Sequence, residues 1–357
     1  MKIATVIGAR PQFVKAAPLS RALRRRHEEI LIHTGQHYDY DMSKVFFEEL
    51  AIPAPDFHLD IRETGHAAQT GRMLIAIEKI LLETRPGAVV VLGDTNSTLA
   101  GALAAAKLNI PVAHVEAGLR SFNRRMPEEI NRILADHVSG WLFAPTVVAV
   151  GNLAAEGITR GVTNTGDVMM DIVLENLPRI ETHTAALGEH GLSPKGYYLA
   201  TIHRDFNTDN PANLAAILEG LSSLDKPVLF PIHPRTRKAV EALRGASSIA
   251  AGREDVIRFI PPVGYLTMLT FQRHAFKIIT DSGGIQKEAY LLGTPCITLR
   301  PETEWVETVE SGWNRLIPAA PSEIRAAAVA PFTPSRREPY YGNGDAAVRI
   351  AEILSCE

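Results

Sequence analysis

The sequence contains very little cysteine. Only Cys296 and Cys356 occur among its 357 residues. Two cysteines are too few for the disulfide framework of a small secreted domain, and such a composition fits a reducing compartment. The chain also has no apolar run of about 18 residues and no basic, apolar leader at its start. These features predict a cytoplasmic protein that neither enters a membrane nor is secreted.

The sequence lacks an excess of either charge. Lys and Arg number 37 against 40 Asp and Glu, which gives a formal net charge of −3. No overall field therefore recruits nucleic acid or anionic lipid, and we expect neither as a partner. The 46% of hydrophobic and 22% of charged residues are typical of a folded globular protein. Any site for an anion has to be built locally.

Familiar cofactor motifs are also missing. The sequence has no CxxC pair and no two histidines spaced i, i+4 on an expected helix, so we expect no metal. No expected strand leads into GxGxxG, the GNGD at 342–345 follows no expected strand, and no P-loop occurs. We therefore expect no metal and no nicotinamide cofactor.

The length and the alternation of apolar segments indicate two α/β domains. A chain of 357 residues exceeds what one hydrophobic core usually organises. Short apolar runs alternate with helical patterns, which favours parallel sheets. The expected strands are 2–7, 30–33, 88–92, 111–115 and 141–144 in the first half, and 197–201, 228–231, 256–260, 276–280 and 296–299 in the second. The fold class is thus α/β, with two Rossmann-like, doubly wound parallel sheets.

The alternation of expected strands and helices begins again after a region without a clear strand. This places the crossing between the two domains near 166–196. We expect an N-terminal Rossmann-like domain over 1–170 and a C-terminal Rossmann-like domain over 171–341. A last helix within 342–357 is expected to pack back on the first domain.

Three expected strands of the first half end in polar clusters. These are GARPQFVKAAPL at 8–19, GDTNSTLAGALAA at 93–105 and HVEAGLRS at 114–121. Carboxyl ends of parallel strands share one edge of a sheet, so Arg10, Asp94 and Glu116 should converge there. The alternative is a surface ion pair for Arg10 and a helix cap for Asp94. Glu128 and Glu129 follow Pro127, where a simple electrostatic role at a helix start is the alternative.

The second half offers a candidate nucleotide site in TDSGGIQKEA at 280–289. Ser282, Gly283 and Gly284 form a small-residue turn between a strand and a helix, where free backbone N–H groups can hold a diphosphate. Glu288 lies one turn further on and could accept hydrogen bonds from two ribose hydroxyls. Such a turn also serves plain loops, so the motif alone leaves both interpretations open.

Three further polar residues follow expected strands of the second half. His203 lies in TIHRDFNTDN at 201–210 and His233 in PIHPRTR at 231–237, while Arg300 follows the strand at 296–299. Taken singly, each histidine is as easily structural as functional, and a surface ion pair is the alternative for Arg300.

Taken together, the motifs resemble one family. GARPQFVKAAP, TGQHYD, GDTNSTLAGALAA, HVEAGLRS, MPEEINR, HPRT and DSGGIQKEA, in this order, closely resemble the non-hydrolysing UDP-N-acetylglucosamine 2-epimerases. The resemblance covers nearly the whole chain. It implies the GT-B architecture, two Rossmann-like domains with a UDP-sugar bound between them.

The resemblance also implies roles for individual residues. Asp94, Glu116 and Glu128 would be the catalytic carboxylates around the sugar, and His203 would lie near the diphosphate and be needed for catalysis. Residues implied in binding the substrate are Arg10, Lys15, His233, Ser282, Gly283, Gly284, Glu288 and Arg300. UDP would leave by anti elimination across C1 and C2, giving 2-acetamidoglucal, and would add back after C2 is reprotonated from the opposite face. Which carboxylate is acid and which is base stays open.

The substrate has two candidates within the family. TEWVE at 303–307, together with RSFNRRMPEEINR, is similar to the branch acting on UDP-2,3-diacetamido-2,3-dideoxyglucuronate, whereas the family as a whole acts on UDP-GlcNAc. The family commonly has a carboxylate where this chain has Phe206. Outside the family, a GT-B glycosyltransferase would not need three carboxylates, and a UDP-sugar-binding regulator would need no turnover.

Many bacterial members also bind a second UDP-GlcNAc as an activator. Gln36, His37 and His233 match that allosteric site, but Asp39 and Asp205 replace its Gln and Arg. We therefore expect a weak activator site. A UDP-sugar substrate and a homodimer complete the expected partners.

The missing motifs generate a first prediction. Turnover should be unchanged by EDTA and should need no added NAD, because neither metal ligands nor a dinucleotide fingerprint is encoded. The measurement is the initial rate of UDP-sugar conversion after dialysis against EDTA, with and without NAD. Activity that EDTA abolishes and a divalent ion restores would contradict the prediction.

Overall fold

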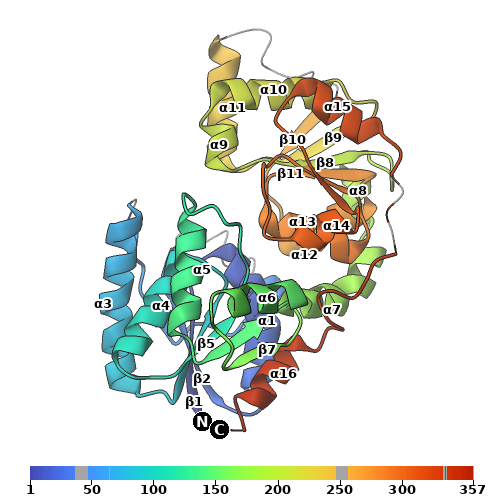
Figure 1. Cartoon of the computed structure of the whole chain (residues 1–357). Coiled ribbons are helices and arrows are strands. Elements are labelled where there is room, and N and C mark those ends of the chain that lie inside the picture. Colours follow the sequence, from blue (N-terminus) through green and yellow to red (C-terminus); the bar gives the residue numbers. More distant parts are fainter. Residues whose placement is uncertain (37–46, 64, 247–255, 333, 335, 357) are drawn as a thin grey trace. The chain divides into compact units, whose positions relative to one another are not determined.

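The structure is a computed structural model of the whole chain, and it describes all residues except 37–46, 64, 247–255, 333, 335 and 357. The chain forms two compact units, one of Met1–Glu175 with Pro339–Glu357 and the other of Asn176–Glu338 (Figure 1). The sequence predicts these divisions at 170/171 and 341/342. The units are described one at a time.

Unit 1 is built on a seven-stranded sheet of order β3-β2-β1-β4-β5-β6-β7, in which all pairings are parallel. Its central strands are almost wholly apolar and buried, as parallel strands covered on both faces must be. Its strands are β1 (Lys2–Ile7), β2 (Glu28–His33), β3 (Phe57–His58), β4 (Ala88–Leu92), β5 (Val112–Val115), β6 (Trp141–Ala144) and β7 (Val162–Asn164). Its helices are α1 (Arg10–Leu23), α3 (His66–Thr84), α4 (Asn96–Lys107), α5 (Pro127–Val138), α6 (Val147–Ala155), the start of α7 (Val168–Thr182) and α16 (Ala346–Ile353).

The last helix of the chain belongs to unit 1. Helix α16 contacts α1, and both lie on the same side of the sheet in Figure 1. Asp171 on α7 accepts hydrogen bonds from the backbone N–H groups of Ala346 and Ala347, at 3.2 and 2.7 Å. These N–H groups have no acceptor within their own helix, so the Asp171 carboxylate takes the place of an N-cap.

Unit 2 is built on a six-stranded parallel sheet of order β10-β9-β8-β11-β12-β13. Helices α9, α10, α11 and α15 form one group of contacts, and α12, α13 and α14 form another. The strands are β8 (Tyr198–Thr201), β9 (Val228–Pro231), β10 (Ile257–Ile260), β11 (Lys277–Thr280), β12 (Cys296–Thr298) and β13 (Asn314–Leu316). The helices, after the end of α7, are α8 (Ala185–Glu189), α9 (Asp205–Thr208), α10 (Pro211–Ser222), α11 (Pro234–Ala246), α12 (Tyr265–His274), α13 (Gly283–Leu292), α14 (Val306–Glu310) and α15 (Pro321–Val329).

The two parallel sheets confirm the expected α/β class, and all ten expected strands are present with ends shifted by at most two residues. The sequence missed β3, β7 and β13, which have two or three residues each and lie at sheet edges. Such short strands carry too little apolar pattern to be recognised. Chain segments that follow β1, β4 and β5 in unit 1, and β8, β11 and β12 in unit 2, leave the carboxyl edges of the sheets. These segments hold most of the candidate site residues, whereas His233 follows β9, Gln36 follows β2 and Glu128 lies in α5.

Candidate active site

Glu116 forms a buried ion pair with Lys15 directly after strand β5. Both residues are less than a tenth exposed, and the Lys15 ammonium on α1 binds the Glu116 carboxylate. The backbone of Glu116 is left-handed, with φ of +75°. This conformation is strained for a residue with a side chain, and such strain concentrates at functional sites.

Gly93, after strand β4, lies directly beside this pair. Its φ is +62°, and a Cβ atom placed on it would lie 3.1 Å from Lys15 Nζ and 3.2 Å from Glu116 Oε2. A side chain here would displace one of the two charges. Because residue 93 is glycine, the backbone of the turn before Asp94 can lie in close contact with the Lys15–Glu116 ion pair.

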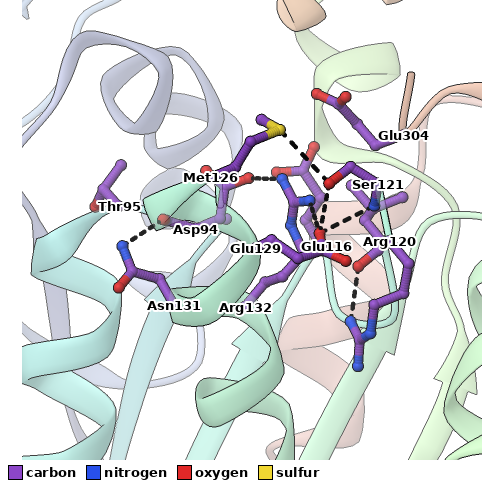
Figure 2. A network of polar contacts seen from close by, with 12 residues as sticks. Asp94, Thr95, Glu116, Arg120, Ser121, Met126, Glu129, Asn131, Arg132 and Glu304 are labelled. Atoms are coloured by element: carbon purple, nitrogen blue, oxygen red, sulfur yellow. Dashed lines mark hydrogen bonds and ion pairs between the residues drawn. The ribbon is translucent and has the colours of Figure 1, made fainter. Parts of the chain in front are cut away.

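Asp94 is held by helix α5. The guanidinium of Arg132, which is only 2% exposed, binds the Asp94 carboxylate through Nη2. Asn131 Nδ2 donates to the Asp94 backbone oxygen at 3.0 Å. Figure 2 shows these α5 side chains pointing toward the turn that carries Asp94. Asp94 keeps 30% of its side-chain surface exposed, so it is fixed in place and still open to a ligand.

Glu129 shares Arg132 with Asp94. Its carboxylate accepts hydrogen bonds from Ser121 N and Oγ, both at 2.9 Å, and from Phe122 N at 2.8 Å (Figure 2). Burial raises the pKa of Glu129, but the hydrogen bonds from Ser121 and the charge of Arg132 outweigh it and hold the pKa below its ordinary value. Glu129 therefore stays ionised and ties the segment after β5 to helix α5.

One alternative from the sequence is wrong in unit 1. The N-cap of α4 is Thr95, whose Oγ1 accepts from Thr98 N at 3.3 Å, so Asp94 is not the cap. Glu129 lies in the first turn of α5, as expected, and is also a fully buried partner of Arg132. Its neighbour Glu128 is half-buried in the first turn of α5, and Arg10 is half-buried as the first residue of α1.

In unit 2, a buried carboxylate arranges the loop that carries His203. Asp281, which follows β11 and is fully buried, accepts from the backbone N–H groups of His203 and Arg204, each at 3.0 Å. Asn207 Nδ2 donates to the same carboxylate at 3.0 Å. His203 Nδ1 lies 3.3 Å from Asp281 Oδ1, and 43% of its side chain is exposed. The imidazole thus lies at the protein surface, close to the turn before α13.

The turn into α13 has the buried guanidinium of Arg300 beside it. A Cβ on Gly283 would lie 2.4 Å from Glu304 Oε1 and 3.5 Å from Arg300 Nη1. Arg300 is 3% exposed and donates from Nη2 to Glu304 Oε2 at 2.9 Å. Its Nη1 has no hydrogen-bond partner among the described residues. The alternative of a surface ion pair for Arg300 is therefore wrong. An N–H of this guanidinium and the first N–H groups of α13 suit an anion such as phosphate.

Glu288 lies inside α13, one turn beyond Ser282. Its Oε2 accepts from Gln272 Nε2 at 2.6 Å. Burial raises the pKa of Glu288 to about 7, although Gln272, Tyr265 and Lys287 act in the opposite direction. A carboxyl group in this condition changes its charge readily when a hydrogen-bonding ligand arrives.

The residues of the expected activator site lie in both units. Gln36 in unit 1 accepts from Ser97 N and Oγ at 3.1 and 2.8 Å, and His233 in unit 2 is exposed. His37 and Asp39 lie outside the described residues. Asp205 is paired with Arg235 at 2.7 Å, so a cation compensates the negative charge that the sequence places there.

Comparison with known proteins identifies the family of this chain. A model of the UDP-N-acetylglucosamine 2-epimerase family matches residues 21–355. The chain belongs to this family. A Methanococcus maripaludis protein named as a UDP-N-acetylglucosamine 2-epimerase homolog is 52% identical over 99% of each chain. The UDP-2,3-diacetamido-2,3-dideoxy-D-glucuronate 2-epimerase of Pseudomonas aeruginosa is 48% identical, again over 99% of each chain.

A solved structure extends the similarity to the fold. The crystal structure of Methanocaldococcus jannaschii UDP-GlcNAc 2-epimerase in complex with UDP-GlcNAc and UDP matches with a TM-score of 0.91 and 44% identity, and covers 100% of both chains. This neighbour and the two parallel sheets confirm the expected GT-B fold. Within the described part of this epimerase-family chain, no three His, Cys, Asp or Glu side chains are grouped to hold a metal, and no helix is long and apolar enough to cross a membrane. The expected homodimer and the cytoplasmic location stay predictions.

Sequence reasoning on this family member named Lys15 but missed Arg132, which binds Asp94 and Glu129, and Asp281, which arranges the loop of His203. Arg132 and Glu129 lie three residues apart in MPEEINR, and Asp281 precedes the turn at 282–284. The i, i+3 spacing on an expected helix was the available signal for the first pair. No local pattern shows that Arg132 reaches Asp94, because that contact joins two segments 38 residues apart.

The state of Glu288 generates a prediction for stability. Its pKa is raised from 4.5 to about 7 in the folded protein, so the folded state binds the proton more tightly than the unfolded chain. This carboxyl group therefore costs stability as pH rises from about 4.5 to about 7, and the cost is complete above that range. Glu288→Gln should gain stability relative to the wild type between pH 5 and pH 8, by up to roughly 3 kcal/mol.

Urea unfolding at several pH values measures this effect. Glu310→Gln, at an exposed glutamate of the same unit, is the matched control and should leave the pH dependence unchanged. Parallel pH profiles for the Glu288 variant and the wild type would refute the prediction.

Proposed function

We propose that this protein epimerises C2 of a UDP-N-acetylhexosamine, converting UDP-GlcNAc to UDP-ManNAc without hydrolysis. The observation that carries the proposal is the set of carboxylates at the carboxyl edge of the seven-stranded sheet of unit 1. There Asp94 and Glu116 are each bound by a buried cation. Relatives named UDP-N-acetylglucosamine 2-epimerase support the same activity.

The nucleotide part of the substrate binds unit 2 in this proposal. Its diphosphate accepts hydrogen bonds from the backbone at Ser282–Gly284 and from the free Nη1 of Arg300. Ribose hydroxyls donate to Glu288. His203 lies on the loop beside this turn and donates to the diphosphate as it leaves.

The chemistry follows from the sugar itself. C2 carries no neighbouring carbonyl to acidify its hydrogen, so cleavage of the C1–O bond has to lead. UDP takes both electrons of that bond, the C2 proton passes to a carboxylate, and a C1–C2 double bond forms. Addition of UDP back to C1 and of a proton to the opposite face of C2 gives the epimer. Asp94, Glu116 and Glu128 stabilise the cationic sugar and move the proton.

A second substrate has its own support. The Pseudomonas aeruginosa relative that is named for the diacetamido glucuronate is 48% identical to this chain. This value lies between the 52% of the relative named as a UDP-N-acetylglucosamine 2-epimerase homolog and the 44% of a relative named UDP-N-acetylglucosamine 2-epimerase. TEWVE places Trp305 in a buried position, with Lys287 Nζ 4.1 Å from the centre of its ring. The same elimination and addition would then act on UDP-2,3-diacetamido-2,3-dideoxyglucuronate.

Proton NMR of the purified protein with each UDP-sugar tests the proposal. Conversion of UDP-GlcNAc to UDP-ManNAc, without free sugar or an acceptor, is the expected result. Conversion of only the diacetamido uronate would assign the second substrate. Transfer of sugar to an acceptor, or binding of both compounds without turnover, would overturn the proposal in favour of a glycosyltransferase or a regulator.

Asp94→Asn and Glu116→Gln should each lower turnover by at least about a hundredfold, the scale of a lost acid or base. Each amide keeps the shape of the carboxylate and leaves the sheet intact, so circular dichroism should not change. Glu83→Gln, at an exposed glutamate of α3 in the same unit, is the control and should keep full turnover. Rates near the wild-type value in both site variants would remove these carboxylates from the mechanism.

Regulation gives a further prediction. Arg binds phosphate through two hydrogen bonds, whereas this chain has Asp205, already paired with Arg235. We expect hyperbolic substrate dependence and turnover of UDP-ManNAc without any UDP-GlcNAc. Reverse-direction kinetics decide the matter, since a lag that added UDP-GlcNAc abolishes would show a working activator site.

A further inference from the structure

A chain of hydrogen-bonded polar side chains in unit 1, buried except for Glu156 at its end, adjoins the turn that carries the candidate catalytic carboxylate Asp94. His114 on β5 places Nδ1 2.7 Å from Asp136 Oδ1 on α5. Arg120 donates from Nη1 to Asp136 Oδ2 at 2.7 Å, and from Nε and Nη2 to Glu156, both at 2.7 Å. The side chains of His114 and Asp136 are completely buried. None of these four residues has a role in the function proposed above.

The hydrogen bonds of His114 define where its protons are. Nε2 lies 2.7 Å from the backbone oxygen of Gly93, which can only accept, so Nε2 carries a hydrogen. Nδ1 faces the Asp136 carboxylate, and two bare lone pairs at that distance would repel each other in a dry interior. One proton must therefore lie between His114 and Asp136.

Asp136 is the partner that stays ionised. Burial raises the pKa of Asp136, but His114 and Arg120 outweigh it and hold the pKa below its ordinary value. The second oxygen, Oδ2, also accepts from Gly118 N at 3.1 Å. The Asp136 carboxylate therefore lies between His114 on one side and Arg120 and Gly118 N on the other.

The contact with Gly93 connects this chain to the site. Gly93 N donates to Val115 O at 3.0 Å, and Gly93 O accepts from His114, so both polar groups of Gly93 are tied to β5. Gly93 also lies under the Lys15–Glu116 pair and directly precedes Asp94. A shift of this residue moves both carboxylates at once.

We propose that His114 is a positioning residue for the epimerisation: a buried imidazole whose Nε2 fixes the Gly93 carbonyl, and through it the places of Asp94 and Glu116. The proposal rests on the proposed function for its catalytic part. A histidine with only a structural role would affect stability but not kcat. A positioning residue would also affect kcat, so enzyme kinetics distinguishes the two roles. Small misplacements of catalytic groups lower kcat steeply, while substrate held mainly by other residues keeps its KM.

Two substitutions at position 114 test the role. The amide of Asn is too short to reach Gly93 O, so His114→Asn should lower kcat at least about tenfold with KM within about twofold. The longer amide of Gln reaches as far as Nε2, and His114→Gln should recover a large part of that kcat. Glu29→Gln is the matched control, because Glu29 is a buried carboxylate on β2 that is bound by Ser20, Thr5 and Arg24 away from the site. It should lower stability and leave kcat unchanged.

Nitrogen NMR tests the hydrogen bond from His114 by a readout separate from kinetics. With ¹⁵N-labelled histidine, the wild-type signals that are missing from His114→Gln should show a hydrogen on Nε2, because this nitrogen faces the Gly93 oxygen. An Nε2 without hydrogen, a kcat for His114→Asn within twofold of the wild type, or a loss no larger than that of Glu29→Gln would each overturn the proposal. If His114→Asn does not fold, His114→Gln still assigns the wild-type signal, which decides whether Nε2 carries a hydrogen. A wild type that does not epimerise would instead refute the proposed function.

Discussion

Two buried cations hold the carboxylates of unit 1, and the candidate chemistry depends on them. Lys15 pairs with Glu116, and Arg132 pairs with Asp94 and Glu129. A buried charge without a partner costs several kcal/mol, so cation and carboxylate have to be retained together. The pairing balances the charge of the acidic groups at the ends of two neighbouring strands. It also fixes helix α5 and the segment after β5 to the sheet, so that folding and site geometry share the same contacts.

The backbone contributes as much to this arrangement as the charges. Glu116 adopts a left-handed conformation and Gly93 another, each directly after a buried parallel strand. The strands cannot shift without disrupting the hydrogen-bonded ladder, and the two turns therefore present their residues at fixed positions. In unit 2 a buried carboxylate also orders a loop, since Asp281 binds the backbone at His203, and Arg300 lies beside the start of α13.

Much of this could be predicted from the sequence, for definable reasons. An apolar run such as Ala88–Leu92 identifies a buried parallel strand, and parallel strands place Arg10, Asp94 and Glu116 at one edge. The partners of those residues could not be predicted, because Arg132 meets Asp94 only after α5 has packed against the sheet. Edge strands β3 and β13 were missed for lack of pattern, and the burial of Arg300 could not be predicted because burial is set by neighbours distant in sequence.

The central claim is that the C2 hydrogen is removed and replaced during turnover. Incubation of the protein with UDP-GlcNAc in deuterated water, followed by proton NMR and mass spectrometry, tests it most directly. The account predicts one deuterium at C2 of the UDP-ManNAc formed, because the new proton comes from solvent at the opposite face. Epimer that keeps its original hydrogen at C2 would contradict the account.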